Sequence, residues 1–515
     1  MAKKNTQSNS QTPGALQKRS PVVAILGHID HGKSTLLDYI RKSHIVDEEA
    51  GGITQSISAY EVERPNGDKI EKITFIDTPG HEAFSGMRER GATTADIALL
   101  IVSAEDGVKT QTIEAYKEIE KAKVPFIVAI NKIDKPNANV EKVKNSLAEA
   151  GVYLEGYGGS ISYVPISAKT GQGVDELLDM ITLTADVADL KGDASKPASG
   201  SIIEAHRDPK KGISATLIIK NGTMGPGMFV ASGAAFSPTR IIENHAGKKV
   251  TEASFSSPVS LVGWNEAPKV GSSFESFTSK RDLEEYLETA QELADAAEAA
   301  EASSGPVAGI GQETRKVIPV IIKADVIGSV EAIAHEMKKI KNDRVVVKVI
   351  LSSIGDVTES DIKGAGANKE TIIVGFNVKI DSRAQAMIER LEMQAATFDI
   401  IYKLVEYLQD KVVERTPKVE VEETVGKAKI LKCFSANKDK QIVGGKVIDR
   451  EINLGHKVKI YRRETIIGDG VIRELQQAKV KASTVNEGFE FGTMIDSKIE
   501  LAPGDVIEDF IIVSK

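Results

Sequence analysis

The sequence predicts a multidomain α/β protein, in which a doubly wound parallel sheet, a β-barrel, an α/β/α module, a long helix and a second β-barrel follow one another. The 515 residues exceed what a single hydrophobic core can hold. Strand and helix patterns alternate over residues 20–190 and again over 316–396. Short strands broken by turns fill residues 201–278 and 424–515, a pattern typical of barrels.

The most informative segment of the first domain follows an apolar run and precedes a helical pattern. It matches the strand, glycine-framed loop and helix of a P-loop, in which backbone N–H groups surround phosphate oxygens. The Lys33 side chain is then expected to contact the β- and γ-phosphates, and the Ser34 hydroxyl is expected to bind Mg²⁺. The predicted phosphate-binding residues are Gly27, His28, Ile29, Asp30, His31, Gly32, Lys33, Ser34 and Thr35.

Two later segments, each after a buried-type strand, indicate which base is bound. Asp134 can accept hydrogen bonds from the ring N1–H and exocyclic amine of guanine, donors that adenine does not present in this arrangement. The second segment, Ser167–Lys169, fits the loop that lies behind the base. The predicted base-binding residues are Asn131, Lys132, Ile133, Asp134, Ser167, Ala168 and Lys169. Together with the P-loop they predict a GTPase.

Two loops between the P-loop and these segments are expected to sense the γ-phosphate. Asp77, Thr78, Pro79 and Gly80 end a strand, where the carboxylate can hold a Mg²⁺-bound water. Thr54, in the loop Ala50–Gln55, is a further candidate Mg²⁺ ligand, and such loops order with GTP. His81 is the candidate catalytic residue, which would orient the attacking water. The alternative is a surface histidine that caps the next helix.

With these motifs in place, the chain resembles bacterial translation initiation factor 2 from about residue 20 to the end. The resemblance extends to Met87–Ala92 and Ile321–Ala332. It implies ribosome-stimulated GTP hydrolysis with GTP and Mg²⁺, and a monomer in the cytoplasm. The implied partners are the ribosomal subunits, with their RNA, and formylmethionyl initiator tRNA, which the last barrel would hold while the subunits join.

Within the last barrel the resemblance is uneven. Cysteines usual in the family near Gly445 and Phe491 are absent, and Leu475–Lys479 lacks the usual basic pair and aromatic residue. The barrel still carries sixteen Lys and Arg against thirteen Asp and Glu from residue 424, which suits an RNA backbone. The residues that the resemblance places at the tRNA are Gly445, Lys479, Gly488, Phe489, Glu490, Phe491 and Gly492.

Composition predicts the connecting segments. Residues 1–19, with four basic and no acidic side chains, read as a disordered tail. A mitochondrial targeting segment has similar charge, but the apolar helix face is missing. Residues 191–200 read as a linker, and residues 281–302 as an acidic linker helix packed on a neighbouring domain. Residues 397–415 are expected to form a spacer helix that holds the last barrel at a distance.

Bulk properties limit the remaining possibilities. The acidic helix carries −7 of the net charge of −8, so basic patches elsewhere remain possible. The single cysteine, Cys433, excludes an intramolecular disulfide and agrees with a reducing cytosol. No apolar run is long enough to span a bilayer.

Three alternative interpretations stay open. A second nucleotide site near residues 324–329 is disfavoured, because no glycine-rich loop follows that strand. A sulfate-activating GTPase would share the P-loop and guanine segment, but its later domains would differ. A GTP-gated RNA- or ribosome-binding module could have lost hydrolysis or initiator specificity, and the departures in the last barrel leave that specificity open.

Overall fold

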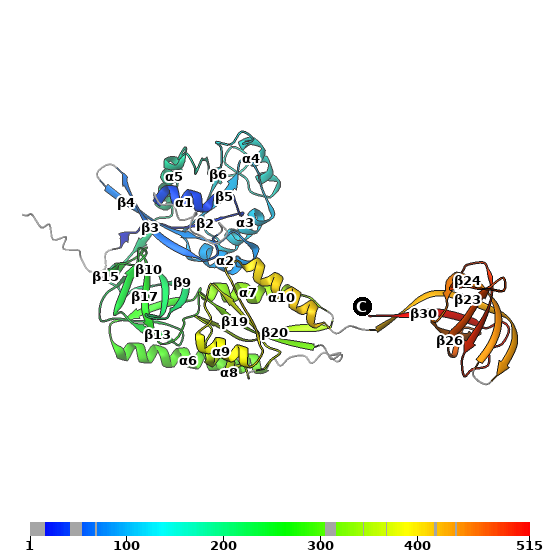
Figure 1. Ribbon diagram of the computed structural model, residues 1–515. Helices are drawn as coiled ribbons and strands as arrows, with labels where there is room; N and C mark the ends of the chain where they lie inside the picture. Colours follow the sequence, from blue (N-terminus) through cyan, green and yellow to red (C-terminus); the bar gives the residue numbers. More distant parts are fainter. Residues whose placement is uncertain are drawn as a thin grey trace, which may run out of the picture. The chain divides into compact units, whose positions relative to one another are not determined.

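The computed structural model describes residues 16–41, 54–66, 69–303, 316–342, 344–366, 368–416, 420–437 and 440–514. It divides into two compact units, residues 1–415 and residues 416–515 (Figure 1). Among the described helices, none is long and apolar enough to cross a membrane. The predictions for the tail over residues 1–15 and for residues 50–53 of the loop before Thr54 lie outside the described residues.

A six-stranded sheet, ordered β3-β4-β2-β5-β6-β7, forms the centre of the first domain. β3 is antiparallel to β4, and the other neighbours are parallel. The elements are β2 (Val22–Gly27), α1 (Lys33–Arg41), β3 (Ser58–Asn66), β4 (Lys69–Asp77), the 3₁₀ turn η3 (Glu82–Phe84), α2 (Ser85–Thr94), β5 (Ile97–Ser103), α3 (Thr110–Ala122), β6 (Phe126–Asn131), α4 (Val140–Glu149), β7 (Tyr163–Pro165) and α5 (Val174–Val187).

Helices cover both faces of this sheet, which is why its central strands are buried throughout. Val23 and Ile25 share a core with α1 and α5, whereas Ala24 and Leu26 share one with α2, α3 and α4. Successive strand side chains point to opposite faces, so one apolar run serves both cores. This confirms the predicted doubly wound sheet.

Two segments predicted to be unstructured instead form part of the first unit. β1 (Gln17–Lys18), inside the predicted tail 1–19, pairs with β8 (Lys191–Gly192), inside the predicted linker 191–200. Arg19 donates two hydrogen bonds to the Asp96 carboxylate, at 2.6 and 2.7 Å. These predictions were wrong for residues 16–19 and 191–192, because the partners lie far away in the sequence.

The predicted first barrel is present as an antiparallel sheet ordered β13-β12-β18-β9-β10-β17-β14-β15. Phe236 exchanges backbone and side-chain hydrogen bonds with Asn265, which follows β17, so the sheet curls back on itself. Its strands, with the separate pair β11 and β16, are β9 (Ser199–Asp208), β10 (Gly212–Asn221), β11 (Thr223–Met224), β12 (Phe229–Ser232), β13 (Ala235–Pro238), β14 (Ile241–Asn244), β15 (Lys249–Val250), β16 (Ala253–Ser254), β17 (Pro258–Trp264) and β18 (Ser273–Phe277).

The acidic helix is α6 (Lys280–Ser303), which runs along the first barrel (Figure 1). Leu283 is buried, and the Tyr286 ring lies 5.2 Å from that of Phe277 in β18. Leu293, two turns further along, is exposed. The predicted packing on a neighbouring domain therefore holds for the first turns, but not at Leu293.

The predicted α/β/α module has a parallel sheet ordered β20-β19-β21-β22. Ile318 and Ile322 of β19 share a core with α7 and α10, whereas Ile321 shares another with α8 and α9. The elements are β19 (Lys316–Ala324), α7 (Ile327–Lys339), β20 (Val345–Ile354), α8 (Glu359–Gly364), β21 (Ile372–Phe376), α9 (Ser382–Arg390), β22 (Gln394–Phe398) and α10 (Ile401–Arg415).

The predicted spacer helix 397–415 needs two corrections. It begins at Ile401, because Thr397 and Phe398 belong to the fourth strand of the module. Its apolar side is buried in the core of the module, through Ile401, Leu404, Leu408 and Val412. α10 is therefore a packed element of the first unit.

The second unit is the predicted C-terminal barrel. Its sheet is ordered β23-β30-β25-β26-β29-β24-β28, and β24 also pairs with β23, which closes it. The half-buried Cys433 thiol donates to the Leu501 carbonyl at 3.0 Å, on the core side. The strands are β23 (Glu420–Asn437), β24 (Lys440–Asn453), β25 (Lys457–Arg462), β26 (Thr465–Gln477), β27 (Val480–Lys481), β28 (Thr484–Asn486), β29 (Glu490–Asp496) and β30 (Val506–Ser514).

Candidate functional site

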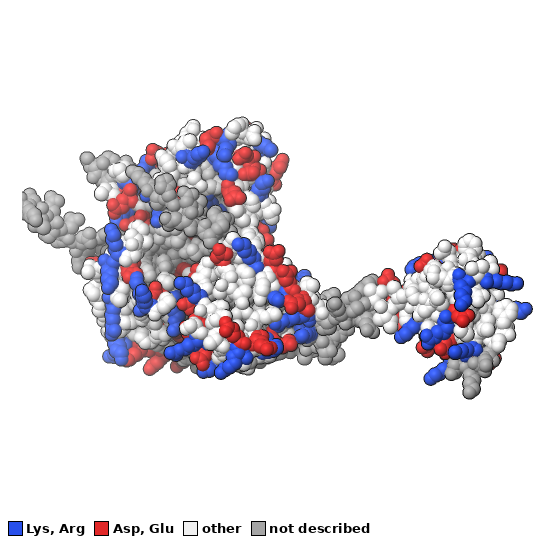
Figure 2. Space-filling model, in the orientation of Figure 1, with Lys and Arg blue, Asp and Glu red and all other residues white. Residues whose placement is uncertain are grey.

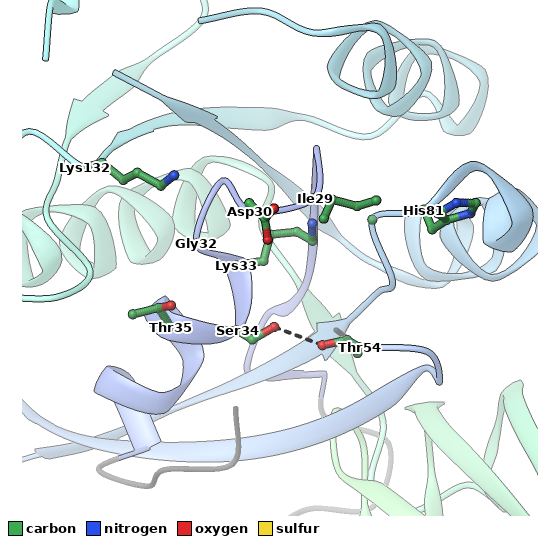
Figure 3. A pocket seen from close by; sticks show the side chains of 10 residues that line it. Ile29, Asp30, Gly32, Lys33, Ser34, Thr35, Thr54, His81 and Lys132 are labelled. Atoms are coloured by element: carbon green, nitrogen blue, oxygen red, sulfur yellow. Dashed lines mark hydrogen bonds between the residues drawn. The ribbon is translucent and has the colours of Figure 1, made fainter. Parts of the chain in front are cut away.

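A pocket opens at the carboxyl ends of β2, β4 and β6, where doubly wound sheets bind ligands. It brings together residues from the P-loop, both predicted γ-phosphate-sensing loops and the predicted guanine segment (Figure 3). The lining residues are Ile29, Asp30, Gly32, Lys33, Ser34, Thr35, Thr54, Gly80, His81 and Lys132.

Lys33 is the buried cation of this pocket. Its ammonium donates to the backbone carbonyls of Gly27, at 3.0 Å, and His28, at 2.7 Å. Burial lowers the pKa of Lys33 to about 8, against the opposing effect of the Asp77 carboxylate. An anion placed here would favour the charged ammonium, which is the property required of a phosphate-binding lysine.

Two glycines leave the space that this arrangement needs. A Cβ on Gly80 would lie 2.5 Å from the Lys33 ammonium nitrogen, so a side chain there would displace the lysine. Gly32 has a φ of 87°, in the left-handed region, and a Cβ there would lie 2.3 Å from the Asn131 amide nitrogen.

The three predicted Mg²⁺ ligands suit a hard divalent cation. The Ser34 and Thr54 hydroxyl oxygens are 2.9 Å apart, although twenty residues separate them (Figure 3). Asp77 is buried at the end of β4, close enough to Lys33 to influence its pKa. Two hydroxyls and a carboxylate are oxygen ligands of the kind that Mg²⁺ prefers. The residues therefore fit the predicted metal.

On the base side, Asn131 forms hydrogen bonds to the P-loop and to both predicted guanine loops. Its side-chain amide donates to the His31 carbonyl at 2.8 Å, and its oxygen accepts from the N–H groups of Lys132, at 2.7 Å, and Ala168, at 2.9 Å. This amide is a structural brace between the P-loop and the predicted guanine loops.

Asp134 is prepared to act as an acceptor. The Ser167 hydroxyl donates to its carboxylate at 2.7 Å, and this hydrogen bond lowers the pKa of Asp134. An ionised carboxylate is what pairing with two guanine N–H donors requires. Ile133 is half-buried and holds the loop through its N–H, which donates to Ile166. Lys169 is exposed.

His81 lines the pocket, but its ring is turned away from Lys33 and Ser34 (Figure 3). Its Nδ1 accepts the N–H of Ala83 at 2.9 Å, so in this structure it caps η3, as in the alternative interpretation. Burial lowers the pKa of His81, which favours a neutral ring. Of the neighbouring residues, Thr78 donates to the Ile25 carbonyl at 2.6 Å and Pro79 is buried, so both shape the loop.

Sequence reasoning assigned no role to Arg88 or Gln111. The fully buried Arg88 donates to the carbonyl of His81 and, at 3.0 Å, to the carboxylate of Glu118. The Gln111 side chain accepts from the P-loop N–H of Ile29 at 3.2 Å. Arg88 lies in the Met87–Ala92 segment that resembles the family, and this segment could have indicated its importance. No motif in the sequence pointed to Gln111.

The predicted tRNA residues lie on neighbouring strands and turns of the second unit. Gly445 pairs with Phe491 between β24 and β29. Gly488 and Phe489 form the turn that enters β29, beside Glu490 and Gly492 in that strand. Lys479 occupies the tight turn between β26 and β27, next to the Gln476–Gly492 pair.

Phe489 and Phe491 have different environments. β29 begins at Glu490, so Phe489, in the turn, is 53% exposed, while Phe491 is only 5% exposed and belongs to the barrel core. A Cβ on Gly445 would lie 2.7 Å from the Phe491 ring. The prediction that Phe491 and Gly445 form the contact surface is corrected: they pack against each other inside the barrel.

Another outward-facing group lies beside these residues, and we call Lys432, Phe434, Ile442, Gly444 and Gly492 the outer patch. Gly444 pairs with Gly492, and Phe434 lies against Gly444. The Phe434 ring is 63% exposed, with the Lys432 ammonium 5.6 Å from its centre. A Cβ on Gly492 would meet nothing within 4 Å. On the face of this unit seen in Figure 2, uncharged surface lies beside lysines and arginines.

Three family models match successive parts of the chain. They are the Elongation factor Tu GTP binding domain over residues 18–186, Elongation factor G domain 2 over 197–277 and Translation-initiation factor 2 over 294–409. A solved structure, GDP-bound aIF5B from Aeropyrum pernix, is 25% identical with a TM-score of 0.46, over 96% of this chain and 92% of that chain.

Curated relatives match across both units. Translation initiation factor IF-2 from Rubrobacter xylanophilus is 38% identical over 98% of this chain and 73% of that protein. The factor from Nitratiruptor sp. is 40% identical over 96% of this chain and 59% of that protein, and the chloroplastic factor of Rhodomonas salina is 39% identical over 97% and 67%. The chain thus spans about three fifths of the length of the Nitratiruptor protein. It belongs to the translation initiation factor IF-2 family.

Proposed function

We propose that this chain is a translation initiation GTPase that binds GTP with Mg²⁺ and hydrolyses it when stimulated by the ribosome. The observation that carries this is the convergence of Lys33, Ser34 and Thr54 in one pocket, with the Asp77 carboxylate close enough to Lys33 to influence its pKa. On the base side, the Ser167 hydroxyl holds the Asp134 carboxylate. The family supports the wider role, which is named in the relatives as translation initiation.

The residues divide the work by position. Backbone N–H groups of the P-loop and the Lys33 ammonium hold the phosphates, while Asp134 selects guanine. Ser34, Thr54 and Asp77 would hold Mg²⁺, which supplies charge neutralisation on the β- and γ-phosphate oxygens when bound. His81 must turn from Ala83 into the pocket to orient the attacking water, because catalysis here is mainly positioning.

The C-terminal barrel is the proposed binding site for the formylmethionyl end of initiator tRNA. The outer patch offers an aromatic ring for stacking, two glycines that permit close approach and a lysine for the phosphate backbone. Phe489 and Lys479 are exposed in adjacent turns and extend this surface. Ribosomal subunits are the other proposed partners, and the cytoplasm is the proposed location of this monomer.

The GTPase assignment is tested with His81→Ala. We expect this variant to keep its GTP affinity within about twofold and to lose ribosome-stimulated hydrolysis, because His81 does not contact the phosphate-binding groups in this structure. Equilibrium binding of a fluorescent GTP analogue and phosphate release with purified ribosomes measure the two properties. Undiminished turnover in this variant would contradict the assignment of His81.

A second candidate is a GTP-gated RNA-binding module that does not select the initiator. Phe491 lies in the barrel core, and the cysteine that the family usually has near this position is absent, which favours this second candidate. Binding of formylmethionyl-tRNA and of the same tRNA uncharged to the full chain separates the two. Tighter binding of the formylmethionyl form supports the initiator site, whereas equal affinity supports the module.

A further inference from the structure

The start of α10 contacts both loops that are proposed to sense the γ-phosphate. Gln55, next to Thr54, donates from its side-chain amide to the Asp399 carbonyl at 2.8 Å and accepts the N–H of Ile401 at 3.3 Å. That N–H is one of the first donors of the helix, which have no partner within the helix itself. Gln55 is buried, so these two bonds fix the first turn of α10 beside Thr54.

The same turn carries Tyr402, which contacts the other loop. The Tyr402 and His81 rings are 4.2 Å apart between centroids and meet edge to face, with an interplanar angle of 77°. The His81 ring therefore contacts the Tyr402 ring and the N–H of Ala83, and it also lies edge to face with Phe84 at a longer 6.1 Å between centroids. The ring points away from Lys33 and Ser34 (Figure 3). The two shorter contacts, with Tyr402 and with Ala83, must break before the ring can enter the pocket.

We propose that Tyr402 is a positioning residue that holds His81 out of the nucleotide pocket and so lowers GTP hydrolysis in the absence of ribosomes. The inference rests on the proposed GTPase function and on the assigned role of His81. An edge-to-face aromatic contact changes the population of the withdrawn ring by about two- to tenfold. Gln55 contributes by fixing the turn that presents Tyr402.

Hydrolysis by the full chain without ribosomes tests this proposal, with kcat and KM measured separately. Tyr402→Ala is expected to raise kcat two- to tenfold and leave KM within twofold, because the phosphate-binding groups are untouched. Tyr402→Phe keeps the ring and is expected to behave as wild type. Tyr153→Ala is the matched control, since Tyr153 is 52% exposed and Tyr402 49%. Tyr402→Leu serves as a second variant if the alanine variant folds poorly.

Two further measurements exclude a merely structural effect. The increase must vanish when Tyr402→Ala is combined with His81→Ala, because the effect acts through that ring. In histidine-labelled protein, the His81 ring-proton NMR signal must shift in Tyr402→Ala and stay in place in Tyr402→Phe, because the aromatic ring current is lost only in the former.

The outcomes separate the inference from the function on which it rests. An unchanged or reduced kcat in Tyr402→Ala, or an equal increase in Tyr402→Phe, overturns the role of Tyr402 while wild-type stimulation by ribosomes still supports the GTPase. Wild-type protein without stimulated hydrolysis overturns the proposed function and this inference together.

Discussion

The GTP-binding domain and the C-terminal barrel differ in how their sequence motifs relate to the folded site. In the first, Lys33, Thr54 and Asp77 are far apart in the chain. Lys33 follows β2, Asp77 ends the parallel strand β4, and Thr54 precedes the antiparallel β3, so all three reach one edge of the sheet. In the second, Phe489 and Phe491 are two residues apart, yet one is exposed and the other is in the core. A motif therefore predicts a site well where topology gathers strand ends, and less well where a turn interrupts strand alternation.

The largest effect that would sharpen this comparison is expected from Asp134→Asn. The change replaces an acceptor-only carboxylate by an amide, which loses a charge-assisted hydrogen bond and presents a donor to the guanine N–H groups. We expect GTP affinity to fall by about a hundredfold or more, equivalent to about 3 kcal/mol. Titration with a fluorescent GTP analogue measures it. Asp189→Asn, an exposed carboxylate paired with Lys191, is the control; retained GTP affinity in Asp134→Asn would contradict the guanine assignment.

In the C-terminal barrel, Phe434→Ala is expected to have a smaller effect. Loss of one stacked ring costs about 1–3 kcal/mol, so formylmethionyl-tRNA affinity should fall roughly tenfold while GTP affinity stays unchanged. Filter binding or fluorescence anisotropy with the full chain measures the first. Ile466→Ala removes a side chain of similar exposure elsewhere in the same barrel. Equal effects of the two variants would show that the outer patch is not the tRNA surface.

Much of the fold was predictable because its signals are local. Apolar runs that end in Gly27, Asp77 and Asn131 indicate buried parallel strands, and the residues that follow them are the site. The missed features depend on contacts between distant segments. Arg19 is ordered by Asp96, and Thr397 belongs to a strand because it pairs with β21.

The identity of the site residues was more predictable than the contacts that hold them in this structure. The residue types at Thr54 and His81 indicate their chemistry. Nothing local shows that Gln55, beside Thr54, contacts Asp399, which is 344 residues away, or that His81 contacts the distant Tyr402. The α/β/α module gives another contact that the sequence does not show. The Gly328 N–H at the start of α7 donates to Glu204 of the first barrel at 3.2 Å. A carboxylate thus occupies the position that a second nucleotide site would need for phosphate.

The smallest predicted effect concerns that carboxylate, which joins domains within the first unit. Burial raises the pKa of Glu204 to about 7, while the backbone N–H groups of Ala205 and Gly328 and the guanidinium of Arg90 oppose the shift. Between about pH 4.5, the usual pKa of a glutamate, and about pH 7, Glu204 keeps its proton in the folded chain but has lost it in the unfolded chain. The stability from this group is therefore full below about pH 4.5 and declines as pH rises to about 7.

Glu204→Gln is expected to remove this decline, because the amide keeps an acceptor for the backbone N–H groups but does not titrate. Relative to wild type, the thermal midpoint of the first barrel should rise by a few degrees between pH 5 and pH 8. Fluorescence of Trp264, the single tryptophan, reports this barrel selectively because its indole is buried there and donates to the Leu261 carbonyl at 3.1 Å. Glu275→Gln, in the neighbouring strand β18 but exposed, is the control. A difference in thermal midpoint that stays constant from pH 5 to pH 8 would show that Glu204 is ionised in the folded chain. The junction would then be held by its charge, paired with Arg90.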